Sequence, residues 1–220
     1  MRTLFSVLVL LSVFAFKNHE VACSANIYLT EMNLVYEHVE NRLSISVPGY
    51  SPSDVSVTVE GGIITKKSHF HVLKPSYGSR EISVKVYVRT RDSILCFVGG
   101  QKFRVRPLPK PIPQLGGLPD NGKSWQKGAV VAQNRLIATY GPGFSYNLKT
   151  RVGNYKAKVV TSDSTYSFSG ENGIVHSGLK HALTQLDSSD MVVFYAIEGL
   201  TYLEKDTLRS SLPSIVIPIR

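Results

Sequence analysis

The feature that most constrains the fold is a strict alternation of apolar and polar residues in the first half of the chain. Ile82, Val84, Val86 and Val88 occupy every second position, with Ser, Lys and Tyr between them. Successive side chains of a β-strand point to opposite faces, so a period of two predicts half-buried strands. Two shorter runs alternate in the same way: Leu43, Ile45 and Val47, and then Val55, Val57 and Val59.

Turn-forming residues separate these runs at 48–54, 61–62, 75–78 and 99–100. Such Gly, Pro, Ser and Asp clusters end strands and allow the chain to reverse. Because no helical pattern lies between the strands, the sheet is expected to be antiparallel. We therefore predict a first β-sandwich domain over residues 26–106.

The second half returns to strand-like patterns after residue 125, with one helical interruption. Ser177 is a suitable N-cap, and the apolar residues that follow it have the i, i+3, i+4 and i+7 spacing of one helix face: Leu179, Ala182, Leu183 and Leu186. Strands are expected at 129–132, 136–140, 144–148, 155–160, 165–168, 191–197 and 214–219, with Pro218 at a sheet edge. The prediction is an all-β chain of two consecutive immunoglobulin-like antiparallel β-sandwich domains, the second over 125–220 with one short helix.

A connector is predicted over residues 107–124. Proline stands at every second position of its first part, as Pro107, Pro109, Pro111 and Pro113, and Gly116 and Gly117 follow. Proline fixes φ and cannot donate to a β-ladder, so this segment is expected to be extended and exposed. In polyproline II geometry it would be a semi-rigid spacer of roughly 20 Å.

The first 25 residues have the pattern of a signal peptide. A short basic start precedes an apolar run from Leu4 to Phe16, which is shorter than the roughly 20 residues of a membrane-spanning helix. Cleavage after Ala25 is favoured over acylation of Cys23 as a lipoprotein, because Glu20 stands where a lipoprotein site needs an apolar residue. The predicted location is the periplasm or the outer membrane, with membrane contact only through such a lipid anchor.

Either outcome removes Cys23 as a disulfide partner, so the fold is not expected to depend on a disulfide. Cys96 lies in an apolar stretch and is interpreted as a small buried hydrophobic residue rather than as a nucleophile.

Catalytic patterns are missing from the sequence: it contains no Gly-x-Ser-x-Gly elbow, no His-Glu-x-x-His and no phosphate-binding glycine loop. His69 and His71 would share one face of a strand and could supply two metal ligands, but no third ligand group accompanies them. Exposed polar residues are the favoured interpretation, and His176 and His181 are given no role. We therefore predict no enzyme, no metal and no cofactor.

The formal net charge of +9 does not favour a nucleic-acid partner, because the Lys and Arg residues are spread singly along the chain. A basic surface facing anionic envelope components is an alternative to ordinary solubilising charge.

The run at 41–57, with Pro48, Gly49 and Asp54 in its turn, resembles the opening of a C-terminal periplasmic domain of the gliding-motility protein GldM, also called PorM. The segment 103–109 with the glycines at 116–117 is similar to that family's interdomain junction, and 188–194 with 212–215 resembles its ending. The order and spacing of these segments carry the resemblance, which covers nearly all of the chain after the signal peptide.

The resemblance implies a link to type IX secretion and gliding motility. Family members join a proton-driven inner-membrane motor to a dimeric series of periplasmic domains that extends towards an outer-membrane ring. This sequence has a signal peptide where the family has a motor helix. We therefore expect the distal, partner-contacting portion as a separate envelope protein, without the means to use a proton gradient.

The function predicted from the sequence is a non-catalytic protein-interaction module of the cell envelope. Envelope proteins, including secretion-ring components, are the expected partners, and a homodimer is left open. The alternative is a periplasmic or surface lectin-like adhesin that binds glycan through its sandwich loops. Neither reading involves nucleic acid.

Overall fold

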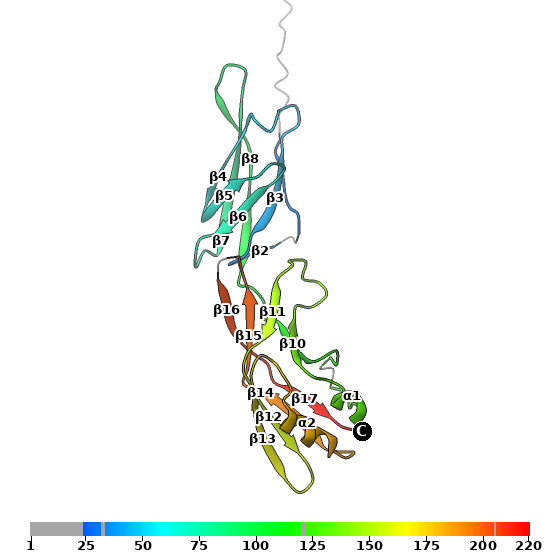
Figure 1. The fold of residues 1–220 in the computed structure, drawn as a ribbon. Coiled ribbons are helices and arrows are strands. Elements are labelled where there is room, and N and C mark those ends of the chain that lie inside the picture. Colours follow the sequence, from blue (N-terminus) through cyan, green and yellow to red (C-terminus); the bar gives the residue numbers. More distant parts are fainter. Residues whose placement is uncertain (1–23, 32–33, 120–121, 205) are drawn as a thin grey trace, which may run out of the picture.

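A computed structural model describes residues 24–31, 34–119, 122–204 and 206–220 of the chain. Two β-rich domains lie end to end, the N-terminal one uppermost in Figure 1. Each has its own hydrophobic core. The predicted all-β class with two consecutive β-sandwich domains is confirmed.

Within the described residues, the first domain packs two four-stranded sheets against each other. One sheet has the order β1 (Asn26–Leu29), β3 (Asn41–Ser46), β6 (His71–Pro75), β5 (Gly62–Lys66). The other has the order β2 (Val35–Tyr36), β8 (Leu95–Arg106), β7 (Glu81–Arg89), β4 (Val55–Glu60). The pairing is antiparallel except between β2 and β8, which run parallel.

The alternating residues of β7 build the core of this domain. Ile82, Val84 and Val86 are fully buried and Val88 is 1% exposed. They face Leu43 of β3 and Leu73 of β6 on the opposite sheet. The apolar residues that alternate in the sequence are thus the buried residues of the core, because each strand has one face against the other sheet.

The second domain combines smaller sheets with two short helices within the described residues. The strand pair is β9 (Ile112–Leu115) with β10 (Leu136–Thr139). A three-stranded sheet has the order β11 (Lys149–Val152), β15 (Ile197–Tyr202), β16 (Thr207–Leu212), and a four-stranded sheet the order β13 (Thr165–Gly170), β12 (Tyr155–Val160), β14 (Met191–Tyr195), β17 (Ile215–Pro218). The helices are α1 (Lys127–Val131) and α2 (Ser177–Thr184).

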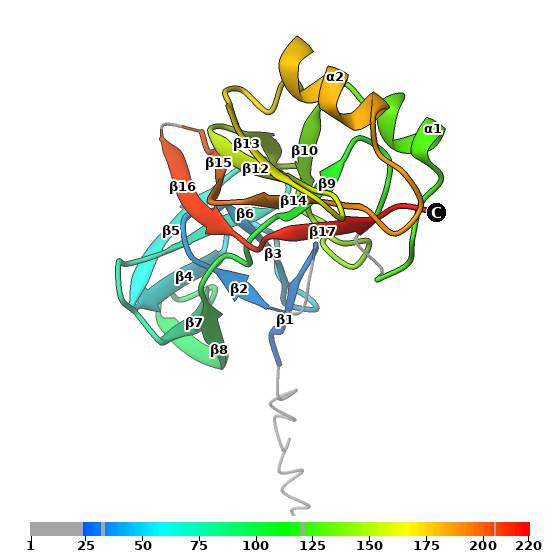
Figure 2. The same cartoon turned by 90° about the horizontal axis from the view of Figure 1, so that it is seen from below.

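The two larger sheets of this domain meet where two neighbouring strands change sheet. Ala196, with φ of 47°, separates β14 from β15, and residues 153–154 separate β11 from β12. Figure 2 shows α1 and α2 on one side of the sheet of β12, β14 and β17. Leu179 and Leu183 of α2 and Val130 of α1 are buried in the second core.

The structure corrects several expectations for the second half. The predicted strand at 129–132 is the end of α1, since a short apolar run does not distinguish a buried helix from a strand. The predicted strand at 144–148 is a loop, and the sequence reading missed β15 and β16. The helix after 176 is confirmed, and so is the edge position of Pro218 in β17.

The exposed connector is shorter than the predicted span of 107–124. Pro107 and Pro109 are exposed, but Pro111 and Pro113 are buried, and Pro113 lies within β9 opposite Ala138. Leu115 and Leu118 belong to the second core. The alternating prolines are compatible with a strand here because β9 pairs on one side, with β10, within the described residues.

Cys96 is exposed, so its interpretation as a buried hydrophobic residue is wrong. The hairpin of β7 and β8 continues past the core at this point, and the opposite sheet does not cover it. The predicted signal peptide and Cys23 lie outside the described residues, apart from residues 24 and 25. No helix in the described part of the chain is long and apolar enough to span a membrane.

Candidate protein-binding site at the interdomain junction

Asn41 organises the end of the first domain that faces the second. Its side chain is fully buried at the start of β3. The Oδ1 atom accepts the Tyr36 N–H at 2.8 Å, and Nδ2 lies within donating distance of the carbonyls of Tyr36 at 2.9 Å, Val39 at 3.1 Å and Leu73 at 3.2 Å. One amide thus fixes the 36–41 turn, in which His38 has a φ of 64°, to the neighbouring strand β6.

The second domain reaches this turn through its 141–148 loop. The Tyr146 hydroxyl donates a hydrogen bond of 2.8 Å to Asn41 Oδ1. The Tyr146 ring also meets the Tyr36 ring edge-on, with centroids 5.8 Å apart. The buried amide that holds the first domain together therefore also binds the second.

An aromatic cluster surrounds this hydrogen bond. Phe144 stacks on Tyr140 with centroids 4.2 Å apart and lies 5.7 Å from Tyr36 and 5.4 Å from Tyr146. The Tyr140 and Thr201 hydroxyls share a hydrogen bond of 3.2 Å, which ties the cluster to β15. Aromatic pairs of this geometry add to the stability from buried area, so the junction is a packed interface and not a flexible link.

Tyr146 and Tyr140 are neutral phenols at physiological pH, and burial moves their pKa values further above it. Burial raises the pKa of Tyr146 well above its ordinary value, helped by the nearby Glu31 carboxylate and by Tyr36. Burial also raises the pKa of Tyr140, against the hydrogen bond with Thr201, which lowers it. A neutral phenol can donate the bond to Asn41, so the junction keeps its hydrogen bonds at physiological pH.

A cavity of about 870 Å³ opens beside this interface, between the two domains. The charged residues that line it are Glu31, Glu37, Glu40, Glu204 and Asp206 on the acidic side and Arg42, Lys74 and Lys149 on the basic side. Among these described residues, five negative charges therefore face three positive ones, in a chain whose net charge is +9. The cavity is a locally acidic groove in a basic protein.

Ion pairs neutralise three of these five carboxylates. Lys74 Nζ lies 2.9 Å from Glu40 and 3.1 Å from Glu204, and so bridges the two domains; the hydrogen bonds to these carboxylates raise the pKa of Lys74. Arg42 pairs with Glu31 at 3.4 Å. Glu37 and Asp206 form no ion pair among the described residues, which leaves two carboxylates available to a partner.

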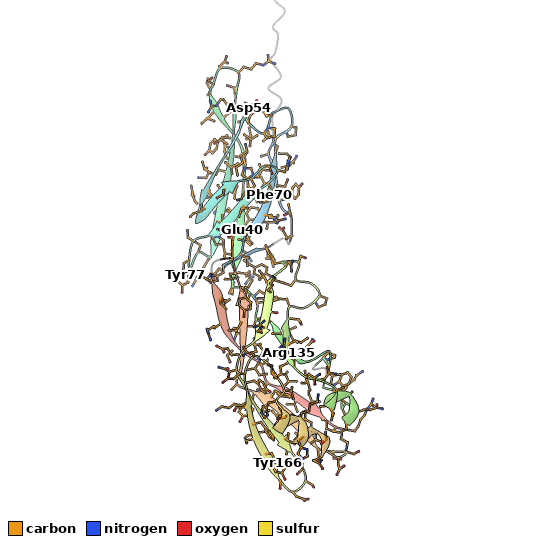
Figure 3. The ribbon with its side chains drawn as sticks, in the orientation of Figure 1. Glu40, Asp54, Phe70, Tyr77, Arg135 and Tyr166 are labelled. Carbon is orange, nitrogen blue, oxygen red and sulfur yellow. The ribbon has the colours of Figure 1, made fainter. Side chains whose placement is uncertain are left out.

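Two tyrosines complete the mouth of the groove. Tyr77, in the turn between β6 and β7, is 94% exposed, and Tyr202 at the end of β15 is 39% exposed. Figure 3 shows Tyr77 at the level where the two domains meet, below Glu40. Exposed aromatic side chains beside carboxylates provide both apolar and charged contacts to a ligand.

The residues singled out from the sequence lie mostly elsewhere. His69 is in the turn before β6 and His71 is the first residue of β6, so they do not share a strand face as expected. Burial lowers the pKa of His71, and the positive charge of Lys66 lowers it further. Its Nδ1 has no hydrogen-bond partner among the residues that the structure describes. No group of three or more metal-ligating side chains occurs in the described ranges.

His176, given no role from the sequence, is the N-cap of α2 in place of Ser177: its Nδ1 accepts the Leu179 N–H at 3.3 Å. The junction residues Asn41, Phe144 and Tyr146 were not singled out either. The Gly141-Pro142-Gly143 sequence before Phe144 is the signal that could have identified a loop instead of a strand.

Comparison with known proteins identifies the first domain. Residues 24–106 match the family model described as GldM third domain, and the match ends where β8 ends. The first domain is similar to the GldM third domain. This confirms the resemblance over residues 24–106. The similarity of the glycines at 116–117 to the family's junction, and of 188–194 and 212–215 to its ending, stays a prediction.

Other comparisons add little to this GldM-like assignment. No curated protein matches the chain. Among solved structures, the D00-D0 domain of Intimin is similar at 11% sequence identity and a TM-score of 0.27, with 87% of this chain and 99% of that chain covered.

Proposed function

We propose that this chain is a non-catalytic envelope protein that binds a partner protein at the junction of its two domains and acts with the gliding-motility and type IX secretion machinery. The GldM third-domain match over residues 24–106 is the observation that supports the machinery. The packed junction supports a structural role, because Asn41 and the aromatic cluster hold two sandwiches in one orientation. The proposed location is the periplasm or the outer membrane.

The negative charge of the groove indicates the kind of segment that a partner would insert there. The unpaired carboxylates of Glu37 and Asp206 fit a segment that carries Lys or Arg, and complementary charge speeds association and excludes wrong partners. A groove built from both domains binds such a segment only while the domains keep their orientation. Rigidity at Asn41 and Tyr146 therefore serves recognition.

Capture from envelope extract, followed by titration of the captured protein, tests this function. Glu37→Lys combined with Asp206→Lys reverses two charges of the groove and should weaken binding at least about tenfold. Asp163→Lys combined with Glu171→Lys makes the same change in net charge at exposed positions of the second domain, and should bind like wild type. Equal affinity of the groove variant and the control would refute the groove as the binding site.

A glycan is the second candidate ligand, because Tyr77 and Tyr202 line the same groove as the carboxylates. Aromatic faces beside acidic groups can hold a sugar ring. A glycan array probed with wild type and Tyr77→Ala separates the two functions: sugar binding that needs Tyr77 would favour the adhesin, whereas protein capture that survives Tyr77→Ala and fails on charge reversal would favour the interaction module.

A further inference from the structure

The β7–β8 hairpin carries an exposed apolar tip at the end of the molecule farthest from the second domain. Ile94 is 60%, Leu95 55% and Phe97 60% exposed, and Figure 1 shows this hairpin extending past the other strands of the first domain. Apolar residues exposed singly are ordinary, but three within four positions of one hairpin form a patch. Nothing in the described chain covers it.

The strand register gives this patch a defined face. Tyr87 is opposite Phe97 and Arg89 is opposite Leu95. Phe97 contacts the Tyr87 ring edge-on with centroids 5.6 Å apart. Tyr87, Leu95 and Phe97 therefore lie on the outer face of the sheet, away from the core side occupied by Val86 and Val88.

The tip is a fixed structure and not a loose loop. Thr90 N–H donates to Ile94 O at 2.9 Å, Ser93 N–H to Thr90 O at 2.9 Å, and Ile94 N–H to the Thr90 hydroxyl at 3.3 Å. At the base of the hairpin, Arg89 N–H donates to Asp54 O at 2.8 Å. Because the backbone of the tip is already ordered, binding through its apolar side chains would not have to order the chain first.

The amino-terminal segment joins the domain at this same end. Ala25 N–H donates to Val98 O at 3.1 Å, and Ala25 packs against the first core. Val98 follows Phe97 directly and is three residues from Leu95, so the partner of Ala25 lies about 10 Å along the strand from Leu95 and nearer to Phe97. The family match begins at residue 24, directly after Cys23.

We propose that the tip formed by Ile94, Leu95 and Phe97 docks on a lipid surface. Acylation of Cys23, the alternative to cleavage after Ala25, would place a lipid chain at this same end of the domain, because Ala25 bonds to Val98 beside the patch. Arg89 and Arg91, both exposed, flank the tip and can reach lipid phosphates while Leu and Phe enter the acyl boundary. The second domain and the groove then point away from the membrane.

The chain from Ser24 to Arg220 tests the tip without the segment before it, and it retains every residue of both cores. We expect it to co-sediment with vesicles of phosphatidylethanolamine and phosphatidylglycerol. Leu95→Ser combined with Phe97→Ser should lower the partition coefficient at least about tenfold. Ile63→Ser removes an apolar side chain that is 68% exposed on β5, in the other sheet, and should leave partition unchanged.

Cys96 gives a direct readout at the tip, because it is exposed and is the single cysteine of the Ser24–Arg220 chain. An environment-sensitive fluorophore attached there should shift to shorter wavelength when vesicles are added. Absence of vesicle binding, or binding that Leu95→Ser with Phe97→Ser leaves intact, would overturn the proposal. So would loss of a dimer in sedimentation equilibrium for that variant with an unchanged fluorophore spectrum, since the tip would then be a contact between copies.

Discussion

The Tyr146 hydroxyl of the second domain donates a 2.8 Å hydrogen bond to Oδ1 of Asn41, the fully buried asparagine of the first. The same oxygen accepts the Tyr36 N–H, so one amide group serves the turn of its own domain and the orientation of the next. Local stability and domain orientation are therefore coupled at a single side chain.

Tyr146→Phe and Asn41→Ala should destabilise the protein to different degrees. The Phe variant loses one hydrogen bond, and Asn41 Oδ1 still accepts from Tyr36, so a loss of about 1 kcal/mol is expected. The Ala variant leaves a buried N–H and several carbonyls unpaired, so a loss of at least about 3 kcal/mol is expected. Urea unfolding measures both, with the exposed Tyr166→Phe as control; equal losses would contradict the role of Asn41.

Phe144→Ala should loosen the domain orientation while each sandwich stays folded. The substitution removes the stack on Tyr140 and the edge contact to Tyr36. Small-angle scattering should then show a broader distribution of shapes, with an unchanged circular dichroism spectrum. Pro107→Gly combined with Pro109→Gly affects only exposed link residues, and should change the scattering less. A larger change in the proline variant would show that the link sets the orientation.

The first domain could be predicted in detail because each of its main strands has one face in the core. The alternation from Ile82 to Val88 is a direct record of that burial. Phe144 and Tyr146 alternate in the same way, yet they lie in a loop, because contacts across the junction bury them and no neighbouring strand does. Periodicity cannot separate these two origins of burial.

The junction itself could not be predicted from the sequence. Asn41 precedes the alternating residues of β3 and looks like any polar residue before a strand. Its importance depends on the carbonyl of Leu73 and the hydroxyl of Tyr146, which are far away in the sequence. The acidic groove also combines residues from both domains, and a single-sequence reading does not bring these together.

Alkaline pH should destabilise the protein once it rises above about 10, where the tyrosines of the unfolded chain ionise. Burial raises the pKa of Tyr155, whose hydroxyl donates to Ile174 O at 2.6 Å, to about 12. The unfolded chain loses this proton near pH 10, and the folded chain keeps it, so stability is complete below about pH 9 and falls as pH rises from about 10 to about 12.

Urea unfolding at about pH 8 and about pH 11 measures this effect. Tyr155→Phe should be less stable than wild type at the lower pH, because it lacks the hydrogen bond, but should lose less stability between the two values. Tyr166→Phe should follow the wild-type profile, because Tyr166 is 52% exposed. If Tyr155→Phe and wild type lost the same free energy of unfolding between the two pH values, a group other than Tyr155 would cause the alkaline sensitivity.

Gly61 should tolerate alanine far less well than Gly49, although their backbones are alike. Both have positive φ, 85° for Gly61 and 83° for Gly49. A Cβ at Gly61 would lie 2.5 Å from the Glu81 carbonyl oxygen, whereas a Cβ at Gly49 would meet nothing within 4 Å. Gly61 joins β4 of one sheet to β5 of the other, so the chain passes close to β7 as it changes sheet.

Gly49→Ala therefore isolates the cost of the left-handed backbone, about 1 kcal/mol. Gly61→Ala adds a collision with backbone that cannot rotate away, so it should cost at least about 2 kcal/mol more. Because β7 carries the central core residues, a shift of Glu81 would reach Ile82 directly. Urea unfolding of the two variants gives the difference; equal free energies of unfolding would mean that β7 yields without cost and that the sheet-to-sheet passage at Gly61 does not require glycine.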